Sequence, residues 1–405
     1  MRILVISNFY PPYYAGGYEL GCYEVMQALK ERGHEVRVLA STYGLNHAQA
    51  ERGIYRWLES DSGWKYKGFI DYKVKLLKKE LNNQKAFKRI IGLFRPDLVY
   101  IWNLSGVSVS LAFMAQHMGL PVCYYVFDEW LSQWESDPWY SLWNRRFICQ
   151  GRCREILFRL IGGVSGLYIP TGSLKLGQVQ FASHYLKQAC LTKGKSMLNA
   201  EVIHWGLDVN KYPYKKAICN PPRLLYVGQI VEHKGVHTAV EALKKIIQLP
   251  GYESITLTIA GGTRDAKYEI NIKRMISSLG LENNVRFIGF IPRENLSSVY
   301  QEHDILLFPS IWEEGFGIIL LEGMSSGLAV VSTSTGGSAE ILQDEINALV
   351  FPKEDADMCA NQILRLMREP GLFEKIRYNG RRTVEGKFNF EPMINKIESL
   401  LCQLK

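Results

Sequence analysis

The chain has 405 residues, of which 47% are hydrophobic and 22% are charged. At roughly 150 residues per domain this length predicts two or three domains, and the composition excludes a disordered or collagen-like chain. The formal net charge of +8 permits an anionic ligand or lipid surface. It does not indicate a nucleic-acid-binding protein unless the charge is concentrated in patches, so no nucleic acid partner is expected.

The cysteine and hydropathy patterns favour an intracellular protein. The eight cysteines are scattered and form no C-x-x-C pair, which makes a zinc knuckle or thioredoxin-type motif unexpected and favours reduced thiols. No apolar stretch approaches the ~20 residues of a membrane span. The apolar start of the chain turns polar at Ser7-Asn8, too early for a signal peptide. We expect a soluble, cytoplasmic protein.

Strand and helix patterns alternate through the first half of the chain. Ile3–Ile6 is a short apolar run before the turn-prone Pro11-Pro12 and predicts a buried strand. A helical pattern begins near Tyr18, ends at Gly33 and precedes a strand at Glu35–Leu39. This order predicts a parallel sheet with covering helices. Further buried strands of this first α/β domain are expected at Leu98–Ile101, Val122–Val126 and Gly166–Ile169.

The alternation restarts near Cys219-Asn220-Pro221-Pro222 and predicts a second parallel sheet. Leu224–Val227 reads as a strand and His237–Ile247 as an amphipathic helix. Later strands are expected at Ile255–Ala260, Val285–Ile288, Ile305–Phe308, Ala329–Ser332 and Ala348–Phe351. Two Rossmann-like domains, residues 1–207 and 208–388, would then leave a cleft between them, with ligands bound beyond the carboxyl ends of the strands.

One such loop carries Gly16-Gly17, between the first strand and its helix. Backbone N–H groups and the helix dipole favour an anion there, and glycines let the backbone approach a phosphate closely. An ordinary structural turn is an equally good interpretation. The spacing does not fit G-x-G-x-x-G, and no G-x-x-x-x-G-K-[ST] occurs, so a dinucleotide fingerprint and a P-loop are excluded.

The most informative segment is Phe308–Glu322, in which a strand runs through a glycine-containing loop into a helix. The N–H groups of Gly315–Ile318 are placed to hold a diphosphate. Glu314 and Glu322 are about 12 Å apart if both lie on one helix, too far for the ~5 Å pair of a retaining glycosidase. Each carboxylate could instead accept sugar or ribose hydroxyls. The alternative is that Glu314 completes the helix start and Glu322 is solvated.

Glu313–Glu340 resembles the signature of the family 4 retaining glycosyltransferases, in which E-x7-E brackets the donor site of a GT-B fold. The opening M-R-I-L-V-I, the turn W-G-L-D at Trp205–Asp208, V-G-Q-I-V-E-H-K-G at Val227–Gly235 and F-I-G-F-I-P at Phe287–Pro292 are similar to further segments of that family, in the same order. The resemblance implies a GT-B fold whose C-terminal helix, residues 389–405, packs back on the first domain.

The resemblance also implies a role for each matching residue. Glu314 would bind donor-sugar hydroxyls beside the anomeric carbon, Glu322 would accept from the ribose, and Lys234 would pair with the diphosphate. Glu314, Lys234 and Asp128 are the candidate catalytic residues. The implied donor-binding residues are Gly16, Gly17, Gly228, Gln229, Lys234, Phe290, Ile291, Glu314, Gly315, Phe316, Gly317, Ile318 and Glu322.

The chain departs from the family pattern at several positions. Gln229 replaces an arginine that faces the diphosphate, and His233 replaces a glutamate. Phe127 stands where many members have a histidine that precedes an aspartate, and Trp102-Asn103 occupies a stretch where His-Asn is common. Asp128 is therefore the best polar candidate on the acceptor side, with a helix cap as the alternative.

Two other features have competing interpretations. Asp355-Ala356-Asp357 spells the D-x-D metal motif of a different glycosyltransferase fold, but its position favours a helix cap. Basic residues between Lys73 and Arg95, and again at Arg145, Arg146, Arg152, Arg154 and Arg159, could contact an anionic membrane surface. A solvated helix face with a core-facing stripe explains each of them equally well.

The resemblance implies retaining transfer of a hexose, with UDP as the expected nucleotide and glucose as the expected sugar, to a hydroxyl of a saccharide or lipid-linked saccharide. Neither a metal nor a cofactor is expected, since helix N–H groups and Lys234 would stabilise the leaving diphosphate and the UDP-sugar is a substrate. The alternatives are a sugar-nucleotide-binding regulator and a sugar-nucleotide epimerase. A location at the inner face of the membrane stays open.

Overall fold

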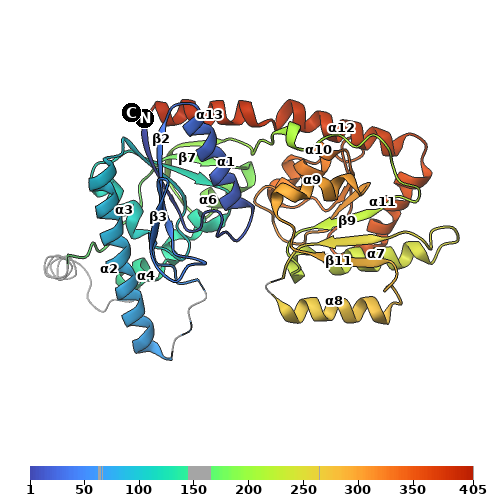
Figure 1. Cartoon of the computed structure of the whole chain (residues 1–405), viewed down its shortest axis with the longest axis horizontal. Helices are drawn as coiled ribbons and strands as arrows, with labels where there is room; N and C mark the ends of the chain where they lie inside the picture. The colour runs from blue at the N-terminus through green and yellow to red at the C-terminus, as the bar shows by residue number, and fades with distance from the viewer. Residues whose placement is uncertain (63–64, 66, 145–165, 264, 405) are drawn as a thin grey trace. The chain divides into compact units, whose positions relative to one another are not determined.

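The computed structural model describes residues 1–62, 65, 67–144, 166–263 and 265–404, and Figure 1 shows two compact α/β units. The first unit comprises Met1–Ile203 together with Ile394–Lys405, and the second comprises His204–Met393. Each unit has its own parallel sheet. The expectation of two Rossmann-like sheets is therefore confirmed.

The first unit is built on an eight-stranded sheet in the order β3-β4-β2-β1-β5-β6-β7-β8. All described neighbours pair in parallel except the short edge strand β3, which is antiparallel to β4. The central strands are buried throughout because helices cover both faces. The strands are β1 (Arg2–Ser7), β2 (Glu35–Ser41), β3 (Gln49–Glu51), β4 (Ile54–Leu58), β5 (Leu98–Asn103), β6 (Val122–Val126), β7 (Leu176–Phe181) and β8 (Met197–Val202).

The predicted first helix of this unit begins and ends near the expected residues. It starts at Gly17, where Gly16 is the N-cap, and ends before Gly33, whose φ of +88° suits glycine. Within the unit, Glu398 of the C-terminal helix accepts from Arg32 (2.7 Å) and pairs with His34 (2.8 Å). The helices are α1 (Gly17–Glu31), α2 (Phe69–Phe94), α3 (Ser110–His117), η1 (Glu129–Ser136), α4 (Pro138–Asn144), α6 (His184–Thr192) and α13 (Phe390–Cys402).

The predicted strand at Gly166–Ile169 is wrong. The backbone of Tyr168 bonds to a side chain and not to a strand: its N–H donates to Gln84 Oε1 (2.6 Å), and its carbonyl accepts from Gln84 Nε2 (2.9 Å). β6 pairs with β5 on one edge and with β7 on the other, and β7 was not predicted from the sequence. Its apolar run is interrupted by two buried glutamines, one of which, Gln180, accepts a hydrogen bond from Tyr100 (2.6 Å).

The second unit has a six-stranded, fully parallel sheet in the order β11-β10-β9-β12-β13-β14. The first strand of the unit therefore lies in the middle, and the chain moves to one side of it and then to the other. In such a sheet the strand order reverses between the two central strands, β9 and β12, and ligands bind beyond the carboxyl ends of these strands. The strands are β9 (Leu224–Val227), β10 (Leu257–Ala260), β11 (Val285–Gly289), β12 (Ile305–Phe308), β13 (Ala329–Ser332) and β14 (Leu349–Val350).

Helices cover this second sheet, and one of them agrees with the helix predicted at His237–Ile247. The amphipathic helix α7 buries Val236, Val240 and Leu243 in the same apolar core as α11. Asp355 caps α11 by accepting from the Met358 N–H (2.8 Å), which confirms the helix-cap interpretation of the D-x-D segment. The helices are η2 (Val209–Lys211), η3 (Glu232–Lys234), α7 (Val236–Ile247), α8 (Ala266–Ser278), α9 (Arg293–Gln301), α10 (Ile318–Ser326), η4 (Gly336–Glu340), α11 (Ala356–Arg368) and α12 (Leu372–Lys387).

Among the helices that the structure describes, none combines the length and the apolar character needed to cross a bilayer.

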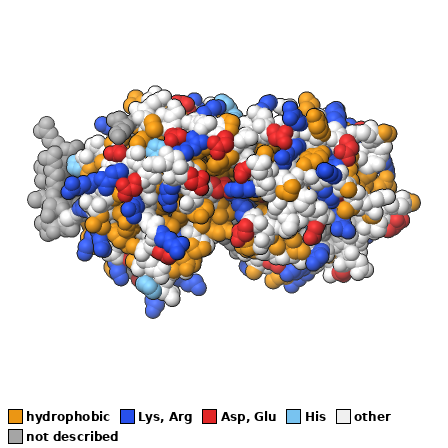
Figure 2. All heavy atoms as spheres, turned by 45° about the horizontal axis from the view of Figure 1, so that its top comes forward, with side chains coloured by type: hydrophobic (Ala, Val, Ile, Leu, Met, Phe, Trp, Pro, Cys, Tyr) orange, Lys and Arg blue, Asp and Glu red, His pale blue; other side chains and the backbone are white. Residues whose placement is uncertain are grey.

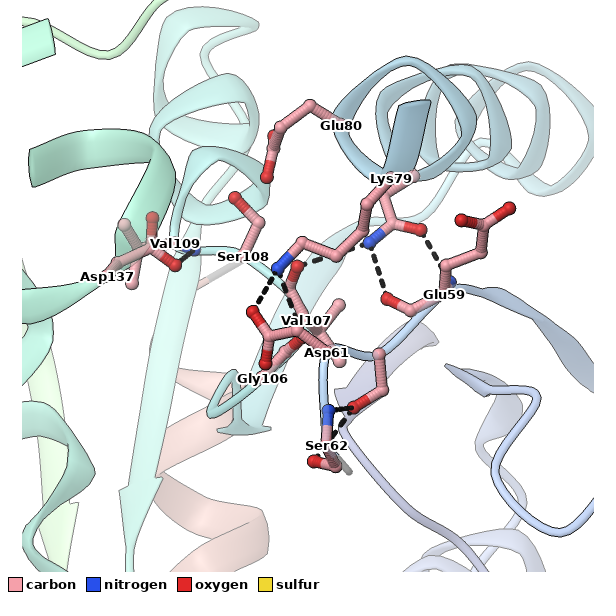
Figure 3. Close-up of polar contacts among 12 residues, drawn as sticks. Glu59, Asp61, Ser62, Lys79, Glu80, Gly106, Val107, Ser108, Val109 and Asp137 are labelled. Atoms are coloured by element: carbon pink, nitrogen blue, oxygen red, sulfur yellow. Dashed lines mark hydrogen bonds and ion pairs between the residues drawn. The ribbon is translucent and has the colours of Figure 1, made fainter. Parts of the chain in front are cut away.

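A buried polar cluster fastens the middle of α2 to the loops that follow β4, β5 and β6 (Figure 3). Lys79 is 1% exposed, and its ammonium donates to Asp61 Oδ2 (2.7 Å) and to the Gly106 carbonyl (3.2 Å). The neighbouring Glu80 is fully buried and accepts from the Ser110 hydroxyl (2.8 Å). Burial, and next the Asp137 charge, raise the pKa of Glu80 to about 7, and Lys79 opposes this shift. The folded state thus favours the protonated acid.

We predict that Glu80→Gln stabilises the protein at alkaline pH. Because folding raises the pKa of Glu80, the contribution of this side chain to the free energy of unfolding is most favourable below its ordinary pKa. That contribution is lost as the pH rises through about 7. The difference in unfolding free energy between the neutral variant and wild type should therefore shift in favour of the variant by about 1–3 kcal/mol from pH 5 to pH 8. Denaturant titrations at both pH values measure this gain. The exposed control Glu282→Gln should show no such difference, and a variant less stable than wild type at pH 8 would contradict the prediction.

Candidate functional site

The loops after the two central strands of the second unit meet at one point. Gly235, with φ +71°, ends the turn after β9, and a Cβ on it would lie 1.9 Å from the Pro309 carbonyl oxygen. Only glycine fits this approach. The N–H groups of Ile311 and Trp312 donate to the His233 carbonyl (3.0 and 3.2 Å), which joins the two loops. The side chains carried by both loops are thereby held together.

Lys234 and Glu314 form an ion pair across this junction. The Lys234 ammonium lies 2.7 Å from Glu314 Oε1 and 2.8 Å from Oε2, and the Ser310 hydroxyl donates to Oε1. Glu314 is 9% exposed, whereas about a quarter of the lysine side chain reaches solvent. The structure therefore brings together two of the three predicted catalytic residues. Sequence analysis assigned them separate partners and did not anticipate that they neutralise each other.

The loop that carries Glu314 is fixed on its other side by a glycine turn. The Gly337 N–H donates to the Glu314 carbonyl (2.6 Å), and the Gly336 N–H donates to Glu313 Oε2 (2.6 Å). Gly336 has φ +50°, and a Cβ there would lie 2.5 Å from the Glu314 carbonyl oxygen. Lys353 pairs with the other oxygen of Glu313. Glu313 is thus a structural residue of the loop, while its neighbour belongs to the Lys234–Glu314 pair.

The helix α10 begins beside this pair, as the sequence predicted. Its N-cap, Gly317, has φ +111° and supplies no side-chain cap in the described structure. The N–H groups of the first turn of a helix have no intrahelical partner and carry the positive end of the helix dipole. Gly315 and Gly317 are half-buried, while Phe316 and Ile318 are buried. This arrangement, together with the Lys234 ammonium, suits a phosphate or diphosphate.

Glu322 lies separately from the pair, and its predicted solvent exposure, the alternative interpretation, is wrong. It is 1% exposed on α10 and accepts from three donors: Tyr212 Oη (3.0 Å), Tyr300 Oη (2.9 Å) and Arg293 Nε (2.9 Å). Burial, and next the Glu322 charge, raise the pKa of both tyrosines. The three donor residues were missed because no motif marks them. Ribose binding by Glu322 stays a prediction, since a carboxylate has about four acceptor positions.

The other predicted donor residues of this unit lie at the carboxyl ends of β9 and β11, which pair with opposite edges of β10. Gly228 follows β9, and the Gln229 carbonyl accepts from the buried Tyr226 hydroxyl (2.7 Å). Phe290 follows β11 and is 63% exposed, with Ile291 half-buried beside it. An exposed aromatic ring at a strand end is a suitable contact for a planar base. The role in base binding stays a prediction.

Gly16 and Gly17 lie in the first unit, at the start of α1. The Gly16 N–H donates to Glu19 Oε2 (2.9 Å), so a carboxylate of the chain itself already faces this helix start. This contact favours the structural interpretation of the turn for Gly16, because an anionic ligand would have to compete with Glu19. Donor binding by the two glycines stays a prediction.

Asp128 caps a helix and also bonds to a second strand end. Its Oδ1 accepts from the Trp130 N–H (2.9 Å) at the start of η1, which confirms the cap interpretation, and its Oδ2 accepts from Asn103 Nδ2 (2.9 Å). Burial raises the pKa of Asp128 to about 6, against the lowering effect of these two hydrogen bonds. A carboxyl group that titrates near neutral pH suits a proton acceptor or a hydroxyl-binding group.

The position of Phe127 is explained by an aromatic cluster at the same end of the first sheet. Tyr18 stacks on Phe127, with 5.7 Å between ring centroids, and its hydroxyl donates to the carbonyls of Tyr125 (2.6 Å) and Trp102. Sequence analysis named Tyr18 only as a helix start and gave it no role at the site. No local signal distinguishes it from the other tyrosines near the glycine turn.

Of the two basic segments, the first forms α2. Leu76, Ile90 and Phe94 of that segment face the core, and Lys79 is buried rather than part of a surface patch, which corrects the prediction for this residue. The second segment, with Arg145, Arg146, Arg152, Arg154 and Arg159, lies outside the described residues.

Comparisons with known proteins match segments of both units to glycosyltransferases. The family model described as glycosyl transferases group 1 matches residues 210–383, and the model described as glycosyltransferase family 4 matches residues 15–157. An uncharacterised glycosyltransferase of Methanocaldococcus jannaschii is 24% identical over 96% of this chain and 95% of its own length. The amylovoran biosynthesis glycosyltransferase AmsK of Erwinia amylovora is 29% identical over half of each chain.

Solved structures share the fold over nearly the full chain. Sucrose-phosphate synthase from Thermosynechococcus elongatus has a TM-score of 0.74 at 20% identity, with 100% of this chain and 98% of that chain covered. HepE from Anabaena, determined in complex with UDP and glucose, has a TM-score of 0.69 at 20% identity and 99% coverage of both chains. With both halves matched in order, the chain belongs to the group 1 glycosyltransferases of family 4 and has the GT-B fold.

Proposed function

We propose that the protein is a retaining hexosyltransferase that moves glucose from UDP-glucose to a hydroxyl of a saccharide or lipid-linked saccharide in polysaccharide or glycoconjugate synthesis. The observation that carries the proposal is the Lys234–Glu314 pair, held beside the start of α10 and beyond the carboxyl ends of the central strands β9 and β12. A cation and helix N–H groups suit a diphosphate, and an adjacent carboxylate suits sugar hydroxyls.

In this mechanism the donor separates the ion pair and uses both partners. The Lys234 ammonium turns from Glu314 to a phosphate oxygen, and the Glu314 carboxylate, still held by Ser310, accepts hydrogen bonds from sugar hydroxyls. N–H groups at Gly315–Ile318 and Lys234 stabilise the charge that develops on the leaving diphosphate. We assign neither side chain of the pair as a nucleophile. The acceptor hydroxyl would attack the anomeric carbon from the same face from which the diphosphate departs, and the leaving phosphate would take the proton of that hydroxyl.

Two known proteins support the choice of donor and acceptor. HepE, with the same fold, has been determined with UDP-glucose, which supports UDP and glucose as the first choice. AmsK acts in amylovoran biosynthesis, which supports a saccharide acceptor. We also propose peripheral contact with an anionic membrane, predicted from the basic segments, because a lipid-linked acceptor would lie at the membrane surface. The donor is a substrate, and we propose no cofactor.

One feature favours a second candidate, a sugar-nucleotide-binding regulator. Phe127, stacked on Tyr18, replaces a histidine that the family resemblance places on the acceptor side. A regulator would bind the nucleotide sugar without turnover, and an epimerase would convert one nucleotide sugar into another. The donor assay separates these outcomes from transfer.

We predict that UDP-glucose raises the melting temperature of the purified protein and is slowly hydrolysed to UDP and glucose. A ligand that binds only the folded state stabilises it by about 2.7 kcal/mol at a concentration 100 times its Kd. Thermal shift with UDP-glucose, UDP-galactose, UDP-N-acetylglucosamine and GDP-mannose identifies the donor. Glucose released initially as the α-anomer supports retention. Binding without UDP release supports the regulator, release of UDP-galactose supports the epimerase, and no shift with any donor contradicts the proposal.

We predict that Glu314→Gln and Lys234→Met each reduce UDP release at least about tenfold, equivalent to ~1.4 kcal/mol of transition-state stabilisation. Because each residue is the other's partner before the donor binds, the double variant should lose less than the product of the two single effects. Steady-state kinetics on the three variants measure this coupling.

The matched controls use the neighbouring ion pair. Glu313→Gln and Lys353→Met remove charges from the same loop region without touching the proposed donor contacts, and each should retain turnover within about threefold. Equal losses in test and control variants would assign the effect to loop stability and overturn the roles of Lys234 and Glu314.

We predict that Asp128→Asn reduces transfer to acceptor at least about tenfold and leaves donor hydrolysis near the wild-type rate. Burial raises the pKa of Asp128 to about 6, so its carboxylate forms as the pH rises through this value, and transfer by wild type should increase over the same range. Asparagine can still cap η1, which keeps the fold intact. The pH profile of transfer checks this prediction. A rising limb near pH 6 that persists in Asp128→Asn would assign it to another group.

A further inference from the structure

The helix α2 has one face in the core of the first unit and an opposite face in solvent. Leu76, Phe87, Ile90 and Phe94 are buried on the inner face, together with the polar anchors around Lys79. This inner face already supplies the packing that the helix needs. Apolar residues on the outer face therefore require a separate explanation.

The outer face carries a continuous apolar stripe along the first half of the helix. Ile70, Val74, Leu77 and Leu81 are 78%, 60%, 43% and 41% exposed. Their spacing of four, three and four residues places them on one side of an α-helix, over about 16 Å. Phe69, at the start of the helix, is 72% exposed beside them. Isolated exposed apolar residues are ordinary, but an aligned row is typical of a binding surface.

Basic residues flank and continue this stripe. Seven residues of α2 are lysine or arginine, whereas Asp71 and Glu80 are its only acidic residues, the latter buried. Lys78 and Lys85 are exposed and make no ion pair with any described residue. Asp71 is neutralised by Lys75, which lies 3.0 Å away. Figure 2 shows hydrophobic and basic side chains intermixed on the surface of the first unit.

We propose that the outer face of α2 binds the surface of an anionic lipid bilayer. The apolar stripe enters the boundary between headgroups and acyl chains, and the flanking lysines extend to the anionic headgroups. The helix is too polar on its inner face to span a membrane, and that face stays in the core of the unit. The chemistry recognised is a negatively charged interface, not one particular headgroup.

Charge distinguishes this occupant from a second copy of the chain. A symmetric contact would place the same helix face against itself and bring the lysines of one copy next to those of the other. Like charges across an interface oppose association. An anionic lipid surface instead complements the lysines and accepts the apolar side chains. The bilayer is therefore the occupant that both properties of the face favour.

This inference rests on the proposed function in one respect: contact with the membrane would bring the enzyme to a lipid-linked acceptor. Lipid binding itself requires no nucleotide sugar and does not use Lys234 or Glu314. The two proposals can therefore fail separately.

The experiment measures co-sedimentation of the full chain with vesicles of phosphatidylcholine alone or with 30% phosphatidylglycerol. We expect binding to the anionic vesicles and little binding to phosphatidylcholine. The variant Ile70→Gln/Val74→Gln/Leu77→Gln should lower the partition coefficient at least about tenfold, because three apolar side chains are lost from the interface. Lys78→Gln/Lys85→Gln should lower it about tenfold. Glutamine is a good helix former, and circular dichroism checks the fold.

Matched controls change exposed residues elsewhere. Leu198→Gln/Ile270→Gln/Ile346→Gln alters three side chains that are 84%, 48% and 49% exposed, and Lys216→Gln/Lys267→Gln removes two exposed lysines. Both should bind vesicles like wild type, and both α2 variants should hydrolyse UDP-glucose at the wild-type rate.

Three results would overturn the inference: no binding to anionic vesicles, equal loss in the control variants, or a dimer in lipid-free buffer that the α2 apolar variant dissociates. The last would make the face an interface between copies. Vesicle binding by a protein that turns over no nucleotide sugar would overturn the proposed function and support the membrane contact.

Discussion

The close approach of the loops after β9 and β12 is the constraint on which the candidate site depends. It exists because Gly235 has no Cβ to meet the Pro309 carbonyl, and because the His233 carbonyl accepts two N–H groups from the facing loop. Lys234 and Glu314 are adjacent as a consequence. Their opposite charges offset the cost of partial burial in the absence of a ligand, so the cation and the carboxylate are held in place before a donor arrives.

The two carboxylates of the E-x7-E segment therefore have different bonding environments. Among the described residues, Glu314 has a single cationic partner, the Lys234 ammonium, and about a quarter of that lysine side chain is exposed to solvent. Glu322 is fixed by two phenols and a guanidinium, and removing any of them would leave a buried charge short of donors. The first is suited to contacts that change during a reaction. The second is suited to a contact that stays the same, such as holding α9 against α10.

The sequence was sufficient to predict strands whose residues are all apolar and buried. It was insufficient to predict segments that bury polar side chains. Strands β9, β12 and β13 were predicted to the residue because parallel strands covered on both faces read as apolar runs. In β7, glutamines interrupt that run, and at Tyr168 the Gln84 amide replaces a strand partner. For the site, strand order alone places Lys234 near Glu314. Their direct pairing, and the donors around Glu322, depend on tertiary contacts that no local pattern encodes.

The strand ends of the two sheets carry different chemistry. At the strand ends of the second unit, charges dominate: an ammonium, a carboxylate and a helix start. At the strand ends of the first unit, aromatic rings surround a carboxyl group whose pKa burial raises to about 6. A charged diphosphate requires the first environment. A neutral hydroxyl that must lose a proton is better served by the second, because an apolar surrounding strengthens each hydrogen bond made to Asp128. The side chains at the strand ends of each unit therefore suit the donor and acceptor roles that we propose for them.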